Sequence, residues 1–172
     1  MKKDRNHILI AISGLKDGEY DFHFTVKPED LTLPDNFREK IEIDIQIEKL
    51  KLRYLSSVHI ETRAQFECDR CLEPVEIPID AEFTILCTSD VNEAKQYDEE
   101  EDVKIVATNE HEIDFTDEIR QYTLLSIPIR RTCGEDAEGV SLCKRDIPTE
   151  RIMPILDFDP RWEELKKLDL KT

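Results

Sequence analysis

Apolar and polar side chains alternate strictly over residues 41–47, with isoleucine at each odd position and a polar residue at each even one. Successive side chains of a β-strand point to opposite faces, so this pattern predicts a strand with one buried face. The alternation slips after residue 47, because the next apolar positions are Leu50 and Leu52. This slip predicts a β-bulge near Glu48 and Lys49.

The same kind of pattern predicts further strands on both sides of this one. They span residues 8–12, 19–26, 55–67, 74–87 and 103–107. Residues 13–18 predict a turn between the first two, because their glycines can adopt positive φ. The links that join the segments 41–52, 55–67 and 74–87 are too short for a parallel crossover, which predicts antiparallel pairs.

The period changes to that of a helix over residues 116–127. Thr116 is expected to cap this helix, and the two acids that follow it complement the positive end of the helix dipole. Pro128 ends the helix, because proline lacks the backbone N–H that a helix needs. A second, short helix is predicted over residues 160–168, with Pro160 at its first position.

These elements predict an α+β fold: an antiparallel twisted sheet or open β-barrel with a packed helix and a C-terminal helical tail. A chain of 172 residues suits one domain with an appendage. We expect a main β-rich domain over residues 1–130, with an acidic loop at 88–102 and the helix near 116–127. Residues 131–172 are expected to form a tail that contains the short helix at 160–168.

The composition predicts a soluble protein of the cytoplasm. The chain is 39% hydrophobic and 37% charged, and its apolar runs are far shorter than a membrane span. Its first residues lack the apolar stretch of a signal peptide. The five cysteines are an odd number, which favours thiols or metal ligands in a reducing compartment over a disulfide framework.

The net charge of −16 argues against broad nucleic-acid binding, because phosphate contacts depend on lysine and arginine. Residues 98–118 contain ten acids and one base. This stretch is either a solvated loop or a docking surface for a basic protein. Its densest part consists of Asp98, Glu99, Glu100, Glu101 and Asp102. Residues 119–134, by contrast, contain arginines and no acid, so they are the expected place for any phosphate contact.

The run Cys68-Asp69-Arg70-Cys71 stands between two predicted strands, and two thiolates at this spacing can hold one metal ion. A turn between strands is typical of zinc knuckles, whereas redox dithiols stand at a helix start. Glycine-rich phosphate loops, nucleophile elbows and the zinc-hydrolase helix motif are all missing from the sequence. We therefore expect no enzyme and no small-molecule substrate.

Three motifs in order resemble the YceD family, the large ribosomal RNA subunit accumulation proteins. They are the run at residues 67–74 around the cysteine pair, the helix-like run at 117–128 and the terminal run at 159–168. The resemblance spans roughly residues 40–168. It implies a non-enzymatic role in the accumulation or processing of 23S ribosomal RNA and in assembly of the large subunit.

Two modes of action follow, and both stay open. In the first, the protein contacts precursor 23S ribosomal RNA through a few basic side chains, namely Arg70, Arg120, Arg130 and Arg131. In the second, the acidic residues 98–102 bind a basic large-subunit ribosomal protein, and the effect on RNA is indirect. A nuclease acting on ribosomal RNA is a third and weaker hypothesis.

The resemblance also bears on whether the chain binds a metal ion. Similar proteins often carry a His or Cys soon after the helix that corresponds to residues 116–127, and another Cys later. Here Cys133 and Cys143 stand in comparable places, so that Cys68, Cys71, Cys133 and Cys143 would form a closed structural zinc site. Nine residues separate the second pair, which is unlike a standard knuckle. Structural zinc, unbound thiols and redox chemistry therefore all remain open at this point.

Overall fold

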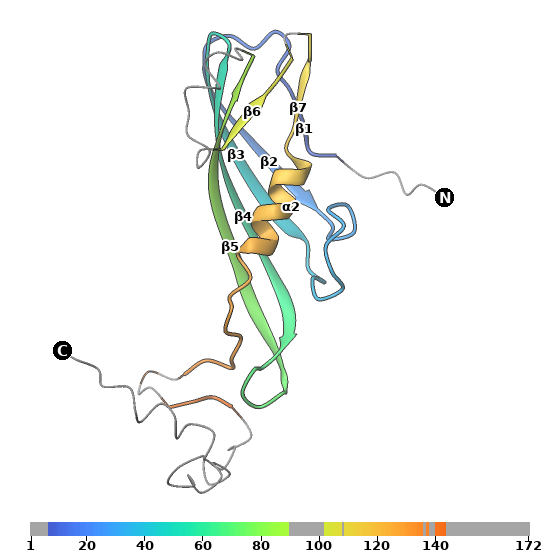
Figure 1. The fold of residues 1–172 in the computed structure, drawn as a ribbon, viewed down its shortest axis with the longest axis vertical. Coiled ribbons are helices and arrows are strands. Elements are labelled where there is room, and N and C mark those ends of the chain that lie inside the picture. Colours follow the sequence, from blue (N-terminus) through green and yellow to red (C-terminus); the bar gives the residue numbers. More distant parts are fainter. Residues whose placement is uncertain (1–6, 90–101, 108, 136, 138–139, 144–172) are drawn as a thin grey trace, which may run out of the picture.

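The computed structural model describes residues 7–89, 102–107, 109–135, 137 and 140–143. Figure 1 shows a tall, twisted sheet with a helix across one face. The elements are β1 (Leu9–Ala11), β2 (Gly18–Val26), β3 (Ile41–Leu50), β4 (Arg53–Glu67), β5 (Pro74–Thr88), β6 (Val103–Ile105), β7 (Glu112–Asp114) and α2 (Thr116–Leu125). Within these described ranges, no helix is long and apolar enough to cross a membrane.

The larger sheet has five strands in the order β2-β3-β4-β5-β6, and the smaller sheet pairs β1 with β7. Neighbouring strands from β2 to β5 are antiparallel, as the short links predicted. The last pair, β5 with β6, is parallel, so the prediction of an antiparallel sheet is wrong at this edge. The connection between these two strands is long enough for the chain to return. Strands β2 and β6 are the two edges, and the sheet is not closed into a barrel.

The main core lies on the inner face of the sheet, beneath α2. At its centre are the four isoleucines of β3, which are at most 1% exposed: Ile41, Ile43, Ile45 and Ile47. Ile119 of α2 is fully buried in the same cluster. The ring of Tyr122, one turn further along α2, stacks on Phe83 of β5 with 4.0 Å between the ring centroids. Burial of apolar side chains therefore holds the helix on the sheet.

Strands β4 and β5 extend beyond their neighbours as a hairpin arm (Figure 1). Pairing of β4 with β3 ends at Glu61, whereas β4 and β5 stay paired to the end of β4 at Glu67. A second hydrophobic cluster supports the arm and consists of Phe37, Ala64, Phe66 and Ile79. Leu124 and Ile127, at and just beyond the end of α2, pack against this cluster. The tip of the arm itself lies beyond both clusters.

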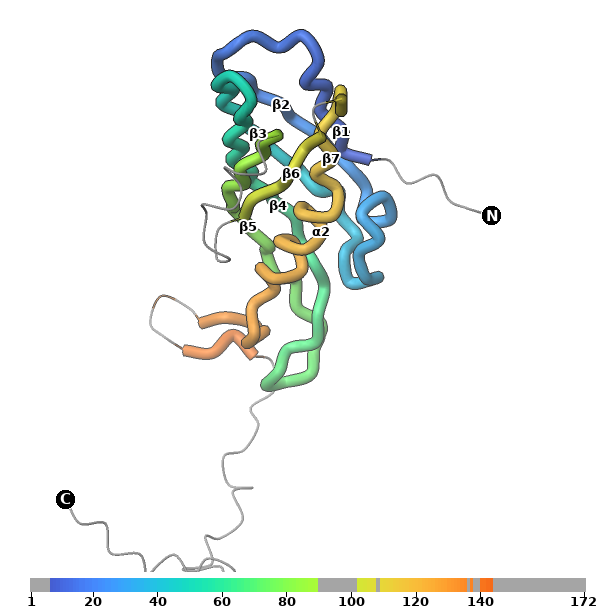
Figure 2. The backbone as a smooth tube through the Cα atoms, turned by 45° about the horizontal axis from the view of Figure 1, so that its top comes forward, coloured from blue at the N-terminus to red at the C-terminus, as the bar shows by residue number. Residues whose placement is uncertain are grey.

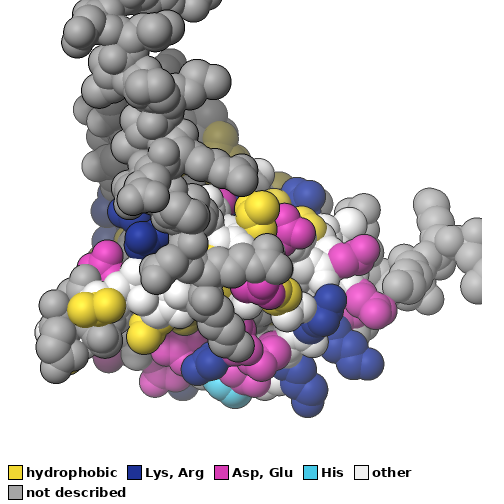
Figure 3. Space-filling view, turned by 90° about the horizontal axis from the view of Figure 1, so that it is seen from below, with side chains coloured by type: hydrophobic (Ala, Val, Ile, Leu, Met, Phe, Trp, Pro, Cys, Tyr) yellow, Lys and Arg dark blue, Asp and Glu magenta, His cyan; other side chains and the backbone are white. Residues whose placement is uncertain are grey.

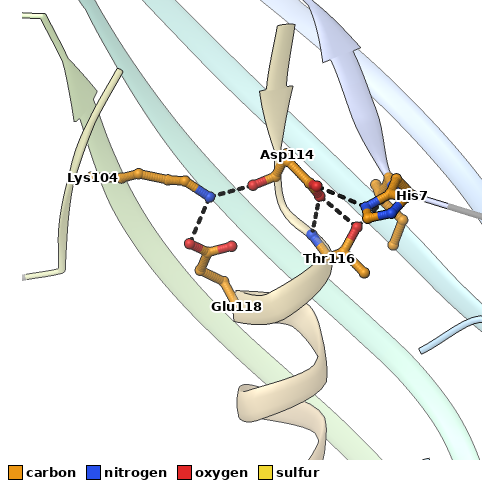
Figure 4. Close-up of polar contacts among 6 residues, drawn as sticks. His7, Lys104, Asp114, Thr116 and Glu118 are labelled. Atoms are coloured by element: carbon orange, nitrogen blue, oxygen red, sulfur yellow. Dashed lines mark hydrogen bonds and ion pairs between the residues drawn. The ribbon is translucent and has the colours of Figure 1, made fainter. Parts of the chain in front are cut away.

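Asp114, at the end of β7, joins α2 to the N-terminal segment (Figure 4). Its carboxylate accepts hydrogen bonds from the backbone N–H and hydroxyl of Thr116 and lies 2.8 Å from Nδ1 of His7. Partial burial opposes ionisation, but these hydrogen bonds lower the pKa of Asp114 below its ordinary value. The helix begins at Thr116, so the N-cap position belongs to Phe115, which makes no side-chain cap hydrogen bond. The predicted capping role of Thr116 is wrong.

The β-bulge predicted near Glu48 and Lys49 is also wrong, because β3 and β4 stay in register to the end of β3. Leu50 ends β3 and Leu52 lies in the turn before β4, and they are 55% and 59% exposed. Their apolar character therefore says nothing about which face of the strand is buried.

Other predictions lie outside the described residues. These are the acidic residues 98–101 of the loop at 88–102 and the short helix at 160–168. The division of the chain at residue 130 stays a prediction.

Candidate metal centre

The turn at the tip of the hairpin arm contains Cys68 and Cys71. The backbone N–H of Cys68 donates to the carbonyl of Glu73 at 2.9 Å, and that of Leu72 donates to the carbonyl of Cys68 at 2.9 Å. Leu72 adopts φ 61°, in the left-handed region that closes the turn. Both cysteines are buried, at 0% and 2% exposure. The arm thus holds both thiols in one tight turn, as the sequence predicted.

The other two cysteines, Cys133 and Cys143, come from the segment that follows α2 (Figure 2). This segment folds back on itself, because the backbone N–H of Leu142 donates to the carbonyl of Gly134 at 3.0 Å. Gly134 has φ 82°, which glycine adopts without strain. The fold-back brings the two thiols together although nine residues separate them. The unusual spacing is therefore no obstacle to a shared site.

All four sulfur atoms lie within 4.8 Å of one another. The Sγ atoms of Cys68 and Cys143 are 3.7 Å apart, and those of Cys71 and Cys133 are 3.6 Å apart. A disulfide would require about 2.05 Å, and all four residues are free thiols. Two sulfurs bound to tetrahedral zinc at about 2.3 Å would lie about 3.8 Å apart. These two sulfur–sulfur distances match that value, and the cluster is thus compatible with zinc binding.

The pKa values of two thiols in the cluster, Cys68 and Cys133, are shifted in opposite directions. A hydrogen bond from the backbone N–H of Cys71 lowers the pKa of Cys68 to about 6. A hydrogen bond with the thiol of Cys71 raises the pKa of Cys133 to about 12. Metal ions bind the thiolate form, so the lowered pKa of Cys68 favours metal binding by this thiol. Cys87 lies in the core on β5, where burial raises its pKa to about 12, and it is not part of the cluster.

Asp69 joins the turn of the arm to the segment after α2 through hydrogen bonds with Arg131. The backbone N–H of Arg131 donates to the Asp69 carboxylate at 2.7 Å, and the backbone N–H of Asp69 donates to the Arg131 carbonyl at 2.7 Å. The Arg131 guanidinium is 3.3 Å from the same carboxylate and 5.2 Å from the ring centroid of Phe66. The pairing of Asp69 with Arg131 was not predicted from the sequence, because these two residues are 62 positions apart.

The four arginines predicted to contact RNA do not all lie together. Arg70 and Arg130 are exposed at the cysteine end, and Arg131 is engaged there by the carboxylate described above. Arg120 lies on α2 and lines a shallow pocket beside residues 30–32. Figure 3, which looks from the hairpin end, shows basic, acidic and hydrophobic side chains close together. Of the four predicted arginines, Arg70 and Arg130 are therefore the two that are exposed at the cysteine end.

Of the acids predicted to bind a partner, Asp102 is the one that the structure describes. Its carbonyl accepts the backbone N–H of Leu86 at 2.9 Å, and its carboxylate accepts the hydroxyl of Tyr122. Asp102 thus contributes to the packing of α2 near the sheet edge. The remaining four lie outside the described residues: Asp98, Glu99, Glu100 and Glu101.

Comparison with known proteins identifies one family. A family model described as large ribosomal RNA subunit accumulation protein YceD matches residues 56–169, more than half of the chain. The match includes the hairpin arm, α2 and all four cysteines of the cluster. No curated protein and no solved structure matches the chain.

We expect the replacement Asp69→Ala to loosen the segment at 131–143, because it removes the carboxylate that holds this segment to the arm. Trypsin should then cut after Arg130 and Arg131 several-fold faster than in the unaltered protein, with a chelator present in both samples. Glu67→Ala removes an exposed carboxylate beside the same turn and should leave the rate unchanged. Equal cleavage of the Asp69→Ala variant and the unaltered protein would contradict the fastening role.

Proposed function

The chain belongs to the YceD family of large ribosomal RNA subunit accumulation proteins, and we propose on this basis that it is a non-enzymatic factor in large-subunit assembly. The family implies a role in the accumulation of large-subunit ribosomal RNA. The finer proposal is that the protein acts in the cytoplasm on precursor 23S ribosomal RNA, affecting its accumulation or processing. The surface that meets this RNA is the cysteine end of the hairpin arm.

The proposal includes one structural zinc ion, held by Cys68, Cys71, Cys133 and Cys143. The observation that supports it is the grouping of all four sulfur atoms within 4.8 Å of one another. A zinc ion with four thiolate ligands has no open position for water or substrate, so its contribution is a cross-link. That cross-link joins the arm to the segment after α2 and keeps their basic residues in fixed positions.

Arg70 and Arg130 are the proposed RNA contacts. Both are exposed at the cysteine end, whereas the guanidinium of Arg131 is already engaged by a carboxylate. Two exposed guanidinium groups on a protein of charge −16 give a weak and local attraction for phosphate. Recognition would then depend on the shape of the RNA and on a few contacts, as is common for folded RNA.

A second candidate is a binding module for a basic large-subunit ribosomal protein. The net charge of −16 favours it, because an acidic surface speeds the encounter with a basic protein. In that case the effect on ribosomal RNA would be indirect. The two candidates differ in the macromolecule that the purified protein binds.

We expect the purified protein to bind one equivalent of zinc per chain, measured by elemental analysis after exhaustive dialysis. Cys68→Ser and Cys143→Ser should each lose most of this zinc, because each removes one ligand. Cys87→Ser is the matched control, since its thiol lies outside the cluster, and it should keep the full equivalent. Full zinc content in both cluster variants would contradict the proposed site.

We expect Arg70→Glu combined with Arg130→Glu to weaken binding to a fragment of precursor 23S ribosomal RNA by at least about tenfold at low salt. The control combines Lys16→Glu with Arg38→Glu, which changes the net charge equally at exposed sites in other loops. The control should lose much less affinity. Equal losses in both variants would refute a specific contact at the cysteine end.

A further inference from the structure

Strand β2 forms one edge of the five-stranded sheet, and all nine of its residues pair with β3 in an unbroken register. No other described strand or helix runs alongside its free edge. Within the described ranges, the backbone hydrogen bonds outside the sheet ladders also leave β2 untouched. In an antiparallel ladder about half of a strand's N–H and C=O groups point away from its neighbour. The free edge of β2 can therefore accept a further strand.

The two edges of the sheet differ in how they are protected against such pairing. The other edge, β6, has only three residues, and one of them is Lys104. Short edge strands and edge lysines both hinder pairing with another chain. The sequence of β2 is three times as long and contains neither lysine nor proline, and its unbroken register excludes a β-bulge. The usual barriers to edge pairing are therefore missing from β2.

The inner-face side chains of β2 are incompletely covered by the rest of the molecule. They are partly buried and consist of Tyr20, Phe22, Phe24 and Val26. Phe22 and Phe24 pack against the main core, whereas the isoleucines beside them on β3 are at most 1% exposed. A further strand along β2 would cover the two phenylalanine rings, and burial of their apolar surface is favourable.

We propose that β2 pairs with β2 of a second copy of this chain, antiparallel and centred on Phe22, so that two copies share one continuous sheet. A two-fold axis makes such an interface self-complementary, because each contact occurs twice. In this register Asp21 of one copy lies opposite His23 of the other. On the inner face Tyr20 lies opposite Phe24, and the two Phe22 side chains are neighbours at the axis.

The side chains of β2 favour this register and this occupant. Opposite charges and aromatic rings that face each other across two strands are stabilising pairs. The hydrogen bond with Asp44 raises the pKa of His23, which favours the charged ring that attracts an aspartate. A centre at Asp21 or at His23 would instead place two like side chains opposite each other. A second copy fits because the same nine residues supply both members of every pair.

The first test is self-association of the full chain by sedimentation equilibrium. A reductant is present, because the cysteines are free and could form disulfides between copies. An interface made by one pair of strands is small, so the measurement covers about 1–300 μM protein. We expect a monomer–dimer equilibrium within this range. A monomer at every concentration would overturn the proposal.

Two single variants test the register. Asp21→Lys places a lysine opposite His23 of the other copy, and His23→Glu places a glutamate opposite Asp21. Each change occurs twice in the dimer, so each variant should dimerise about tenfold more weakly. The matched controls are Glu82→Lys and His59→Glu, which make the same charge changes on the inner strands β5 and β4 and should alter dimerisation less than about twofold. Equal weakening in variants and controls would overturn the proposal.

A mixture of the two variants tests the pairing most sharply. In a mixed dimer the introduced lysine lies opposite the introduced glutamate, and the native Asp21 of one chain lies opposite the native His23 of the other. Equal amounts of Asp21→Lys and His23→Glu should therefore recover dimers that contain one chain of each, identified by native mass spectrometry. Such recovery also shows that both variants are folded. Dimers that contain only one kind of variant chain would overturn the proposal.

Hydrogen exchange of the unaltered protein needs no substitution. Amides of β2 should exchange more slowly at high protein concentration than at low, because the second copy binds the free edge. A concentration effect confined to other segments would overturn the proposal. The inference rests on neither the zinc site nor the RNA contact, so both single variants should keep the zinc content of the unaltered protein. Failure of the pairing would leave the proposed function unaffected.

Discussion

The contact between the tip of the hairpin arm and the segment after α2 is the constraint on which the cysteine end depends. The arm extends past the main sheet, and its tip lies beyond both hydrophobic clusters. A short segment without a core of its own needs a cross-link or specific polar contacts to hold one conformation. Here the pairing of Asp69 with Arg131 supplies the polar contacts, and a zinc ion bound by the four thiols would supply the cross-link. Both interactions join residues that are far apart in the sequence.

This arrangement brings two exposed arginines to one end of the molecule. Arg70 lies in the turn of the arm, and Arg130 lies on the segment after α2. In the proposed function these two side chains contact RNA, and the net charge of −16 would limit indiscriminate binding of RNA elsewhere.

Much of the fold could be predicted from sequence, because strand periodicity is a local property. The hairpin that carries Cys68 and Cys71 and the helix that begins at Thr116 both followed from pattern. The direction of β6 could not, since it depends on how the chain returns after β5. The bulge was wrongly predicted because exposed leucines at a turn resemble core residues. The grouping of Cys133 with Cys143 needed the fold-back at Gly134. Each of these features is non-local.

In the proposed zinc site, the four cysteines bind one ion that joins the arm to the following segment. X-ray absorption at the zinc edge of the purified protein identifies the ligands of this ion. We expect a single shell of four sulfur atoms at about 2.3 Å, with no lighter ligand. A shell that includes nitrogen or oxygen ligands, or a spectrum of aqueous zinc, would show that the four thiols do not form a closed site.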